Sequence, residues 1–457
     1  MDSIYILAEE MKILIDENIP YVEHFFHDYL DDIEYFKDKE FEINMVKEDS
    51  VVITRSTYKT HGKKISKSVK FLCSASTGED HFDKKILDNM NIPYAFSTGA
   101  NAIAVAEYTF STLALMLKEY KFNKEYDAVA VIGCGNIGSK VLKTLDAFDF
   151  EVYGYDPFNT EWLANKITGN SSFAMYSGAY AEAHGLRGLG WDISLREFLD
   201  GTGSNFSTKN STIKFVSLNV PLHEGYKVKH TGAALERWNG ADLESESLSK
   251  KQLENISVYS EFDGCSKIFP TKNLIDEQTF AGLPYGAIIL NTSRGGVVSE
   301  KDFLEFDGVD NYIELISDVF ENEPNINEDF LNKNLFATPH IAGHSQFARY
   351  QMTKMAYENV MNFLGQDIIE RNSILENRII NFEKNIFDRD MKEFGLPVTL
   401  MLDTYNPKSD VFNYKDFKKV RDNYNNRIGY SQIIIKGCSD EADRENLKSL
   451  GFTVEEN

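Results

Sequence analysis

Short apolar runs alternate with amphipathic segments along most of the chain, and the clearest example lies between Ala128 and Asp156. Small and β-branched residues at 129–132 predict a buried strand, and the apolar spacing at 137–148 predicts a helix. A second apolar run at 152–155 predicts another strand. This order of strand, helix and strand predicts a βαβ unit with a parallel sheet.

Further elements of the same kind occur before and after this unit. The additional strands that we predict are 12–15, 51–54, 71–75, 213–220, 287–291, 312–317 and 432–436, and the additional helices are 101–118, 345–364 and 416–426. Because strands and helices alternate, the sequence predicts an α/β fold with a doubly wound parallel sheet. A chain of 457 residues exceeds what one hydrophobic core usually holds, so we expect several domains.

Two insertions interrupt the alternation, at 159–193 and 226–271, and both are rich in Gly, Ser, Asn and charged residues. They contain all three tryptophans of the chain, Trp162, Trp191 and Trp238. Both follow predicted strands, so they leave from the sheet edge at which ligands bind in this fold. Either they pack on each other as a cap at that edge, or they are two surface loops.

The composition of the chain excludes several classes of function. The formal net charge of −23 disfavours binding to nucleic acid and to anionic membranes. No apolar run approaches the ~20 residues of a membrane span, and the N-terminus lacks the basic region of a secretory signal. The four cysteines have neither paired nor metal-like spacing, so we expect a cytoplasmic protein without a metal site.

The turn after the strand at 129–132 carries Gly133, Gly135 and Gly138 in the pattern G-x-G-x-x-G. These glycines allow a tight turn, a close approach of the backbone to a pyrophosphate, and close packing of helix on strand. Asp156 lies 18 residues after Gly138, where a carboxylate accepts hydrogen bonds from ribose hydroxyls. No arginine follows at 157–160 to neutralise a 2′-phosphate, so the predicted cofactor is NAD rather than NADP.

Three polar stretches in the second half follow predicted strands: N-T-S-R-G-G with Arg294, D-V-F-E-N-E-P with Glu323, and T-P-H-I-A-G with His340. Strand ends of a parallel sheet meet at one edge, which would bring these side chains together. Oxidation of a 2-hydroxy acid needs a base for the hydroxyl proton, a cation for the carboxylate and a group that holds the base. Each residue alone has an ordinary structural explanation, but the set predicts such chemistry.

Together these motifs resemble those of the D-isomer-specific 2-hydroxyacid dehydrogenases. Other segments resemble the vitamin B6-pathway branch of that family, whose members act on a phosphorylated 2-hydroxy acid; these segments are 11–21, 54–56, 74–83, 101–108 and 417–431. The resemblance implies that Arg294 binds the substrate carboxylate, that Glu323 pairs with the histidine, and that His340 is the acid/base.

The same resemblance implies two sets of binding residues. Those for NAD are Gly133, Gly135, Asn136, Ile137, Gly138, Asp156, Val220, Asn291, Thr292, Ser293, Asp318 and Gly343, and those for substrate are Arg55, Ser56, Ser76, His344 and Arg427. Arg55 and Arg427 are candidates for the phosphate, although Arg427 is explained equally well by an ion pair in a dimer.

Three positions depart from the pattern of that branch. His344 stands where the branch has a tyrosine, Glu79 where it has a threonine, and Ile428 where it has an arginine. The lost arginine matters most, because it bears on the phosphate.

The resemblance also implies a domain order. A flavodoxin-like substrate domain at 1–100 is completed by about 345–372, a Rossmann NAD domain spans 101–344, and a small α+β dimerisation domain spans 373–457. The implied function is NAD-dependent oxidation of a phosphorylated D-2-hydroxy acid by a homodimer. The alternatives are oxidation of another D-2-hydroxy acid, and dinucleotide sensing without catalysis on the same fold.

Overall fold

The computed structural model describes residues 11–156, 211–221, 271–306, 312–424 and 426–455, with residues 195 and 199 and strands at 174–176, 226–230, 235–239, 242–244 and 266–268. Its contacts divide the chain into two compact units. Unit 1 comprises Met1–Ala104, Gly343–Arg378 and Asn426–Gln432, and unit 2 comprises Val105–Ala342, Ile379–Asn425 and Ile433–Asn457. The predicted division into three domains stays a prediction.

Unit 1 is built on a parallel sheet with the strand order β2-β1-β3-β4-β5. The strands are β1 (Lys12–Asp16), β2 (Ile33–Phe36), β3 (Ser50–Thr54), β4 (Val69–Ser74) and β5 (Tyr94–Phe96). This is the flavodoxin-like order, as the sequence predicts.

Both faces of this sheet are covered. Val51 and Ile53 of β3 pack in one core cluster with Tyr357 of α13 (Gln346–Leu364), next to α2 (Val22–Phe25). Val52, which points to the other face, packs in a second cluster with Leu87 of α3 (Lys84–Asn89). Such alternation within one buried strand is why its sequence is apolar throughout.

Unit 2 contains a seven-stranded sheet with the order β16-β15-β14-β9-β6-β7-β8, and all its neighbouring strands pair in parallel. The strands are β6 (Asp127–Ile132), β7 (Val152–Tyr155), β8 (Ala174–Tyr176), β9 (Thr212–Leu218), β14 (Ala287–Asn291), β15 (Ile313–Ser317) and β16 (Phe336–Ala337). The strand order reverses between β6 and β9, which confirms the doubly wound Rossmann topology.

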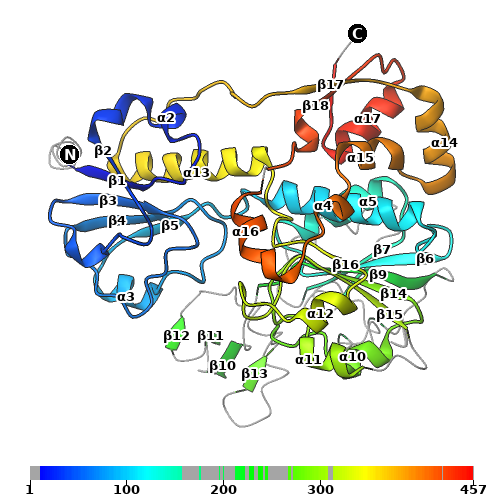
Figure 1. Cartoon of the computed structure of the whole chain (residues 1–457), viewed down its shortest axis with the longest axis horizontal. Coiled ribbons are helices and arrows are strands. Elements are labelled where there is room, and N and C mark those ends of the chain that lie inside the picture. Colours follow the sequence, from blue (N-terminus) through cyan, green and yellow to red (C-terminus); the bar gives the residue numbers. More distant parts are fainter. Residues whose placement is uncertain are drawn as a thin grey trace. The chain divides into compact units, whose positions relative to one another are not determined.

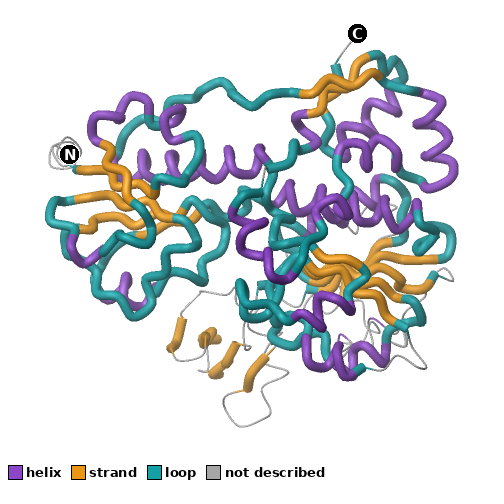
Figure 2. Tube along the Cα trace, in the orientation of Figure 1, coloured by secondary structure: helices purple, strands orange, loops and turns teal. Residues whose placement is uncertain are grey.

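Helices cover both faces of this sheet (Figures 1 and 2). On one face lie α4 (Ala102–Lys118) and α5 (Gly138–Ala147), and on the other lie α10 (Glu277–Gly282), α11 (Glu300–Glu305) and α12 (Glu328–Lys333). Phe280, Phe303 and Phe330, one from each of these three short helices, are at most 2% exposed and share one core cluster with the strands.

Most of the two insertions, with Trp162 and Trp191, lies outside the described residues, so the choice between a cap and loops stays open. The second insertion contains an antiparallel sheet of order β12-β11-β10-β13. Its strands are β10 (Tyr226–His230), β11 (Leu235–Asn239), β12 (Asp242–Glu244) and β13 (Ser266–Ile268).

The C-terminal segment forms a third sheet of order β17-β18-β19 with four helices. These elements are β17 (Arg378–Asn381), α14 (Lys384–Phe394), α15 (Val398–Thr404), α16 (Phe417–Asp422), β18 (Ile433–Lys436), α17 (Glu441–Leu450) and β19 (Thr453–Val454). β18 and β19 pair in parallel, with α17 between them in the sequence. The α+β class of this segment and its part in dimer formation stay predictions.

The predicted helix at 416–426 is wrong in length, since α16 ends at Asp422. Asn423 leaves the helix, and the Tyr424 hydroxyl donates to Asp410 at 2.9 Å. Across the described part of the chain, no helix is long and apolar enough to cross a membrane.

Candidate active site

The glycine turn after β6 has the backbone that the motif predicts. Gly133 has φ +86°, and a Cβ atom there would lie 2.7 Å from both the carbonyl oxygen of Asn219 and the Val220 side chain. A Cβ atom on Gly138 would overlap the carbonyl oxygen of Gly133. At Gly135 a Cβ atom would meet no described atom within 4 Å, so the surface there is open to a ligand.

The rest of this edge also suits a dinucleotide. Asp156 directly follows β7, beside the glycine turn, where its Oδ2 accepts a hydrogen bond from the Cys134 backbone N–H at 2.8 Å. After β14, the buried Thr292 Oγ1 has no hydrogen-bond partner among the described residues. A carboxylate, an open glycine and a buried hydroxyl that follow strands of the same parallel sheet fit the ribose, pyrophosphate and nicotinamide parts of NAD.

The turn that carries Arg294 is held by its own side chains. Asn291 Oδ1 accepts from the backbone N–H of Ser293 at 3.1 Å and from its hydroxyl at 2.8 Å, while Asn291 Nδ2 donates to the Arg294 carbonyl at 3.2 Å. Because Asn291 is buried, these bonds fix the backbone on both sides of Ser293. Asn291 and Ser293 thus shape the turn, whatever part of a cofactor they contact.

Gly295 brings this turn against the loop that follows β15. A Cβ atom on Gly295 would overlap the carbonyl oxygen of Phe320, so only glycine allows the two backbones to come so close. Phe320 in turn donates its backbone N–H to Glu323 Oε1 at 3.0 Å. The Arg294 turn and the Glu323 loop are therefore in direct backbone contact.

Glu323 and His340 form the pair that the sequence predicts. His340 Nδ1 lies 2.7 Å from Glu323 Oε2, and their side chains are 28% and 18% exposed. Burial raises the pKa of Glu323, but the charge and hydrogen bond of His340, the Phe320 N–H and the charge of Arg421 outweigh burial. The net pKa of Glu323 is lowered, which keeps it an acceptor for the ring.

Asp318 holds the His340 loop in place through three hydrogen bonds. Its Oδ1 accepts from the Thr338 hydroxyl and the Ile341 N–H, both at 2.7 Å, and its Oδ2 accepts from the Ala342 N–H at 2.9 Å. Asp318 is 1% exposed, and burial raises its pKa despite these bonds and the charge of His340. This supporting role is visible only in the structure, and a contact of Asp318 with the nicotinamide carboxamide stays a prediction.

Glu300, at the start of α11, is a member of the site that sequence reasoning missed. Its Oε1 accepts the Glu321 backbone N–H at 2.7 Å, so it braces the loop that carries Glu323. Burial, followed by the charges of Glu321 and Glu323, raises the pKa of Glu300 to about 7. A glutamate at the start of a helix has no sequence signal that separates this role from ordinary capping.

The predicted substrate residues all lie in unit 1. Arg55 follows β3 and its Nε donates to Oδ2 of the buried Asp16 at 2.9 Å. Ser56 and Ser76 are joined, because the Ser56 backbone N–H donates to Ser76 Oγ at 2.9 Å. These three residues therefore lie at the carboxyl edge of neighbouring parallel strands.

Arg427 is 8% exposed and contacts the backbone of two helix starts. Its Nη1 donates to the His344 carbonyl at 3.3 Å, and its Nη2 donates to the Ala104 carbonyl at 2.7 Å. Gly343, one residue before His344, packs so closely on Asn101 that a Cβ atom would lie 2.6 Å from its Nδ2. The hydrogen bonds of Arg427 join two backbone segments, which is a structural role. A contact of Arg427 with phosphate stays a prediction.

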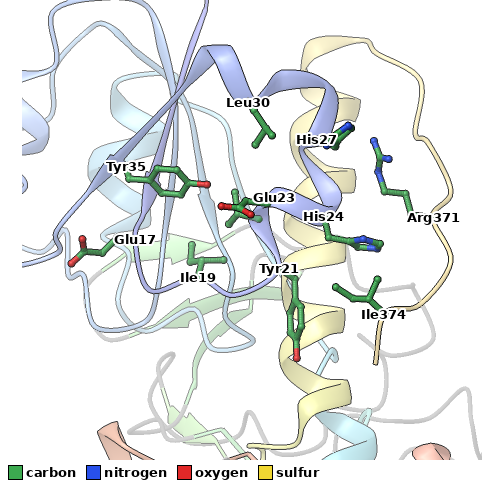
Figure 3. Close-up of a pocket in the computed structure, with 11 residues that line it drawn as sticks. Glu17, Ile19, Tyr21, Glu23, His24, His27, Leu30, Tyr35, Arg371 and Ile374 are labelled. Atoms are coloured by element: carbon green, nitrogen blue, oxygen red, sulfur yellow. The ribbon is translucent and has the colours of Figure 1, made fainter. Parts of the chain in front are cut away.

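Unit 1 also has a cavity of about 1150 Å³ that contains none of the five predicted substrate residues. Figure 3 shows His24, His27 and Arg371 along one side, with Glu17 and Tyr35 on the other. Arg371 is engaged by an ion pair with Asp28. This cavity is thus separate from the residues that the sequence assigns to substrate.

Part of the chain matches a known protein family. Residues 117–177 and 250–342 match the family model described as "D-isomer specific 2-hydroxyacid dehydrogenase, NAD binding domain". The fold resembles the holo form of D-mandelate dehydrogenase from Rhodotorula graminis, with a TM-score of 0.50 over 79% of this chain and 96% of that one, at 15% identity. The chain is an NAD-dependent dehydrogenase of the D-2-hydroxyacid class.

Similar proteins over the full length carry a more particular name. Erythronate-4-phosphate dehydrogenase of Marinomonas sp. (strain MWYL1) is 27% identical over 97% of this chain and 100% of its own length. The protein of that name from Blochmanniella floridana is 25% identical, again over 97% of this chain and all of its own length.

The glycine turn yields a matched pair of variants. Gly138→Ala should lower the free energy of unfolding in urea by about 1–3 kcal/mol, because its Cβ overlaps a fixed backbone oxygen. Gly135→Ala should leave stability within ~0.5 kcal/mol of wild type, yet weaken NADH binding in a fluorescence titration, because the Cβ fills the space for pyrophosphate. Unchanged NADH affinity in Gly135→Ala would exclude that placement.

Glu300 predicts a pH dependence of stability. The pKa of Glu300 in the folded protein, about 7, exceeds the ordinary 4.5. The stability that protonated Glu300 gives the folded state is therefore complete below about pH 4.5 and is lost as the pH rises through 7. Glu300→Gln keeps an oxygen for the Glu321 N–H and cannot ionise. Between pH 5 and pH 8 the variant should gain on the order of 1–3 kcal/mol over wild type in urea unfolding. A constant difference across this range would show that Glu300 titrates normally.

Proposed function

We propose that the chain oxidises 4-phospho-D-erythronate to 2-oxo-3-hydroxy-4-phosphobutanoate with NAD, a step of pyridoxal phosphate (vitamin B6) biosynthesis. The observation that carries the proposal is the Glu323–His340 pair, at 2.7 Å, on the sheet edge of an NAD-binding domain. The named relatives that align over 97% of the chain support the choice of substrate.

The residues of unit 2 divide the chemistry among them. His340 Nδ1 contacts Glu323, so the other ring nitrogen, Nε2, receives the proton of the substrate 2-hydroxyl. Bound NAD is the acceptor for the hydride that leaves C2. Arg294 binds the substrate carboxylate and steadies the developing carbonyl oxygen, and ionised Glu323 stabilises the protonated ring.

The residues of unit 1 bind the rest of the substrate in this proposal. Arg55 supplies positive charge for the phosphate, with the hydroxyls of Ser56 and Ser76 as hydrogen-bond donors. His344 donates to a substrate oxygen, and Arg427 is a second cation for the phosphate. A local cluster of cations is needed because the chain as a whole carries a net charge of −23. We further propose a homodimer formed through the C-terminal segment.

A second candidate is oxidation of a different D-2-hydroxy acid, which the substitutions at Glu79, His344 and Ile428 favour. Turnover with NAD should therefore be measured on 4-phospho-D-erythronate, D-erythronate, D-3-phosphoglycerate and D-lactate. We expect the highest kcat/KM on the first, with a large loss on D-erythronate, which lacks only the phosphate. A higher kcat/KM on another acid would replace the substrate, and NADH binding without any turnover would indicate a dinucleotide sensor.

His340→Gln should lower kcat by roughly 10²- to 10⁴-fold, the usual contribution of general acid–base catalysis. NADH affinity should stay near that of wild type, which a fluorescence titration measures in the same samples. Turnover close to wild type would remove His340 from the mechanism.

A further inference from the structure

An aromatic cluster fixes the C-terminal segment on the loop that carries Glu323. The Phe417 ring, 1% exposed, meets the Phe320 ring edge-on with centroids 5.7 Å apart. Phe412 contacts both rings, at 6.0 Å from Phe320 and 5.6 Å from Phe417. Because Phe320 also donates its N–H to Glu323, this cluster places α16 directly beside the Glu323–His340 pair.

Arg421 lies four residues after Phe417, so both side chains share one face of α16. Its Nη1 is 3.9 Å from Glu323 Oε2, the same oxygen that His340 Nδ1 contacts at 2.7 Å. The Arg421 side chain is 29% exposed, so solvent screens this ion pair only in part.

Arg421 is one of few positive charges near Glu323 among the described residues. Glu300 of α11 and Glu321 of the same loop are carboxylates, and the charge of Glu323 itself contributes to the raised pKa of Glu300. Burial also acts against ionisation of Glu323. Only His340 and Arg421 act in the opposite direction as charges in the described part of the chain, and His340 carries its charge only when protonated.

We propose that Arg421 is a positioning residue, which keeps Glu323 ionised and oriented toward His340 so that the C-terminal segment completes the catalytic pair. This inference rests on the roles of Glu323 and His340 in the proposed function. It gives the segment a part in catalysis that is separate from any part in dimer formation.

The proposal predicts a change in pH dependence. Without the positive charge of Arg421, the pKa of Glu323 rises, because burial is then opposed by His340 and the Phe320 N–H alone. Glu323 would become protonated at a higher pH, so activity would be lost earlier as the pH falls. The substrate KM should change little, since Arg421 is not assigned to substrate.

The test compares full-length Arg421→Gln, Arg421→Lys and the control Lys419→Gln, an exposed residue on the same helix. Profiles of kcat and KM from pH 4 to pH 9.5 should be recorded with NAD and the acid that wild type prefers. For Arg421→Gln we expect the acidic limb of the kcat profile to move to higher pH, so that the loss of kcat relative to wild type grows as the pH falls and is smallest at pH 9. Arg421→Lys should recover most of the loss, and Lys419→Gln should match wild type.

The outcomes separate this proposal from the proposed function. A wild type that oxidises no acid of the panel contradicts the proposed function itself. An active wild type with an identical Arg421→Gln profile overturns the positioning role, as does an equal loss at every pH without recovery in Arg421→Lys. Light scattering on each variant checks that the oligomeric state is unchanged.

Discussion

The hydrogen bond between Glu323 and His340 joins two loops that follow neighbouring strands, and much of the surrounding structure serves to keep it in place. A carboxylate that is largely removed from water is costly unless it is paired and hydrogen-bonded. Here Oε1 receives the Phe320 N–H and Oε2 receives the His340 ring. The pair is therefore stable only if both loops hold their backbones in register with each other.

Two separate contacts provide that register. Gly295 lets the Arg294 turn touch the backbone of Phe320, and Asp318 binds the loop of His340 through two backbone N–H groups. His340 itself has φ +59°, a left-handed backbone that costs of order 1–3 kcal/mol in a residue other than glycine. Such a conformation persists because the buried Asp318 over-determines the loop. The strained backbone of His340 thus lowers the stability of the fold and orients the His340 ring.

Sequence patterns predicted the parts of this architecture whose side chains are buried on both faces. The strands at 152–155 and 287–291 have the predicted bounds, because a strand inside a parallel sheet is apolar along its whole length. The two-residue β16 and the six-residue helices α10, α11 and α12 were missed, since such short elements show no full period.

Within the site, the residues that sequence reasoning missed are those defined by tertiary contact. Glu323 and His340 stood out because each follows a strand in a distinctive motif. Glu300 and Arg421 reach the Glu323 loop from α11 and α16, far apart in sequence, so nothing local marks them.

The division of the chain into two units also explains why the sequence predicts the redox chemistry but not the identity of the substrate acid. The glycine turn, Arg294, Glu323 and His340 all belong to unit 2, and they match what oxidation of a 2-hydroxy acid requires. The three departures from the resembling branch, Glu79, His344 and Ile428, all belong to unit 1. Glu79 is engaged by an ion pair with Lys84, so its charge is partly neutralised at that surface. The proposed substrate residues and the Glu323–His340 pair therefore belong to different units, and we expect a substitution in unit 1 to alter the preferred acid without disturbing the pair in unit 2.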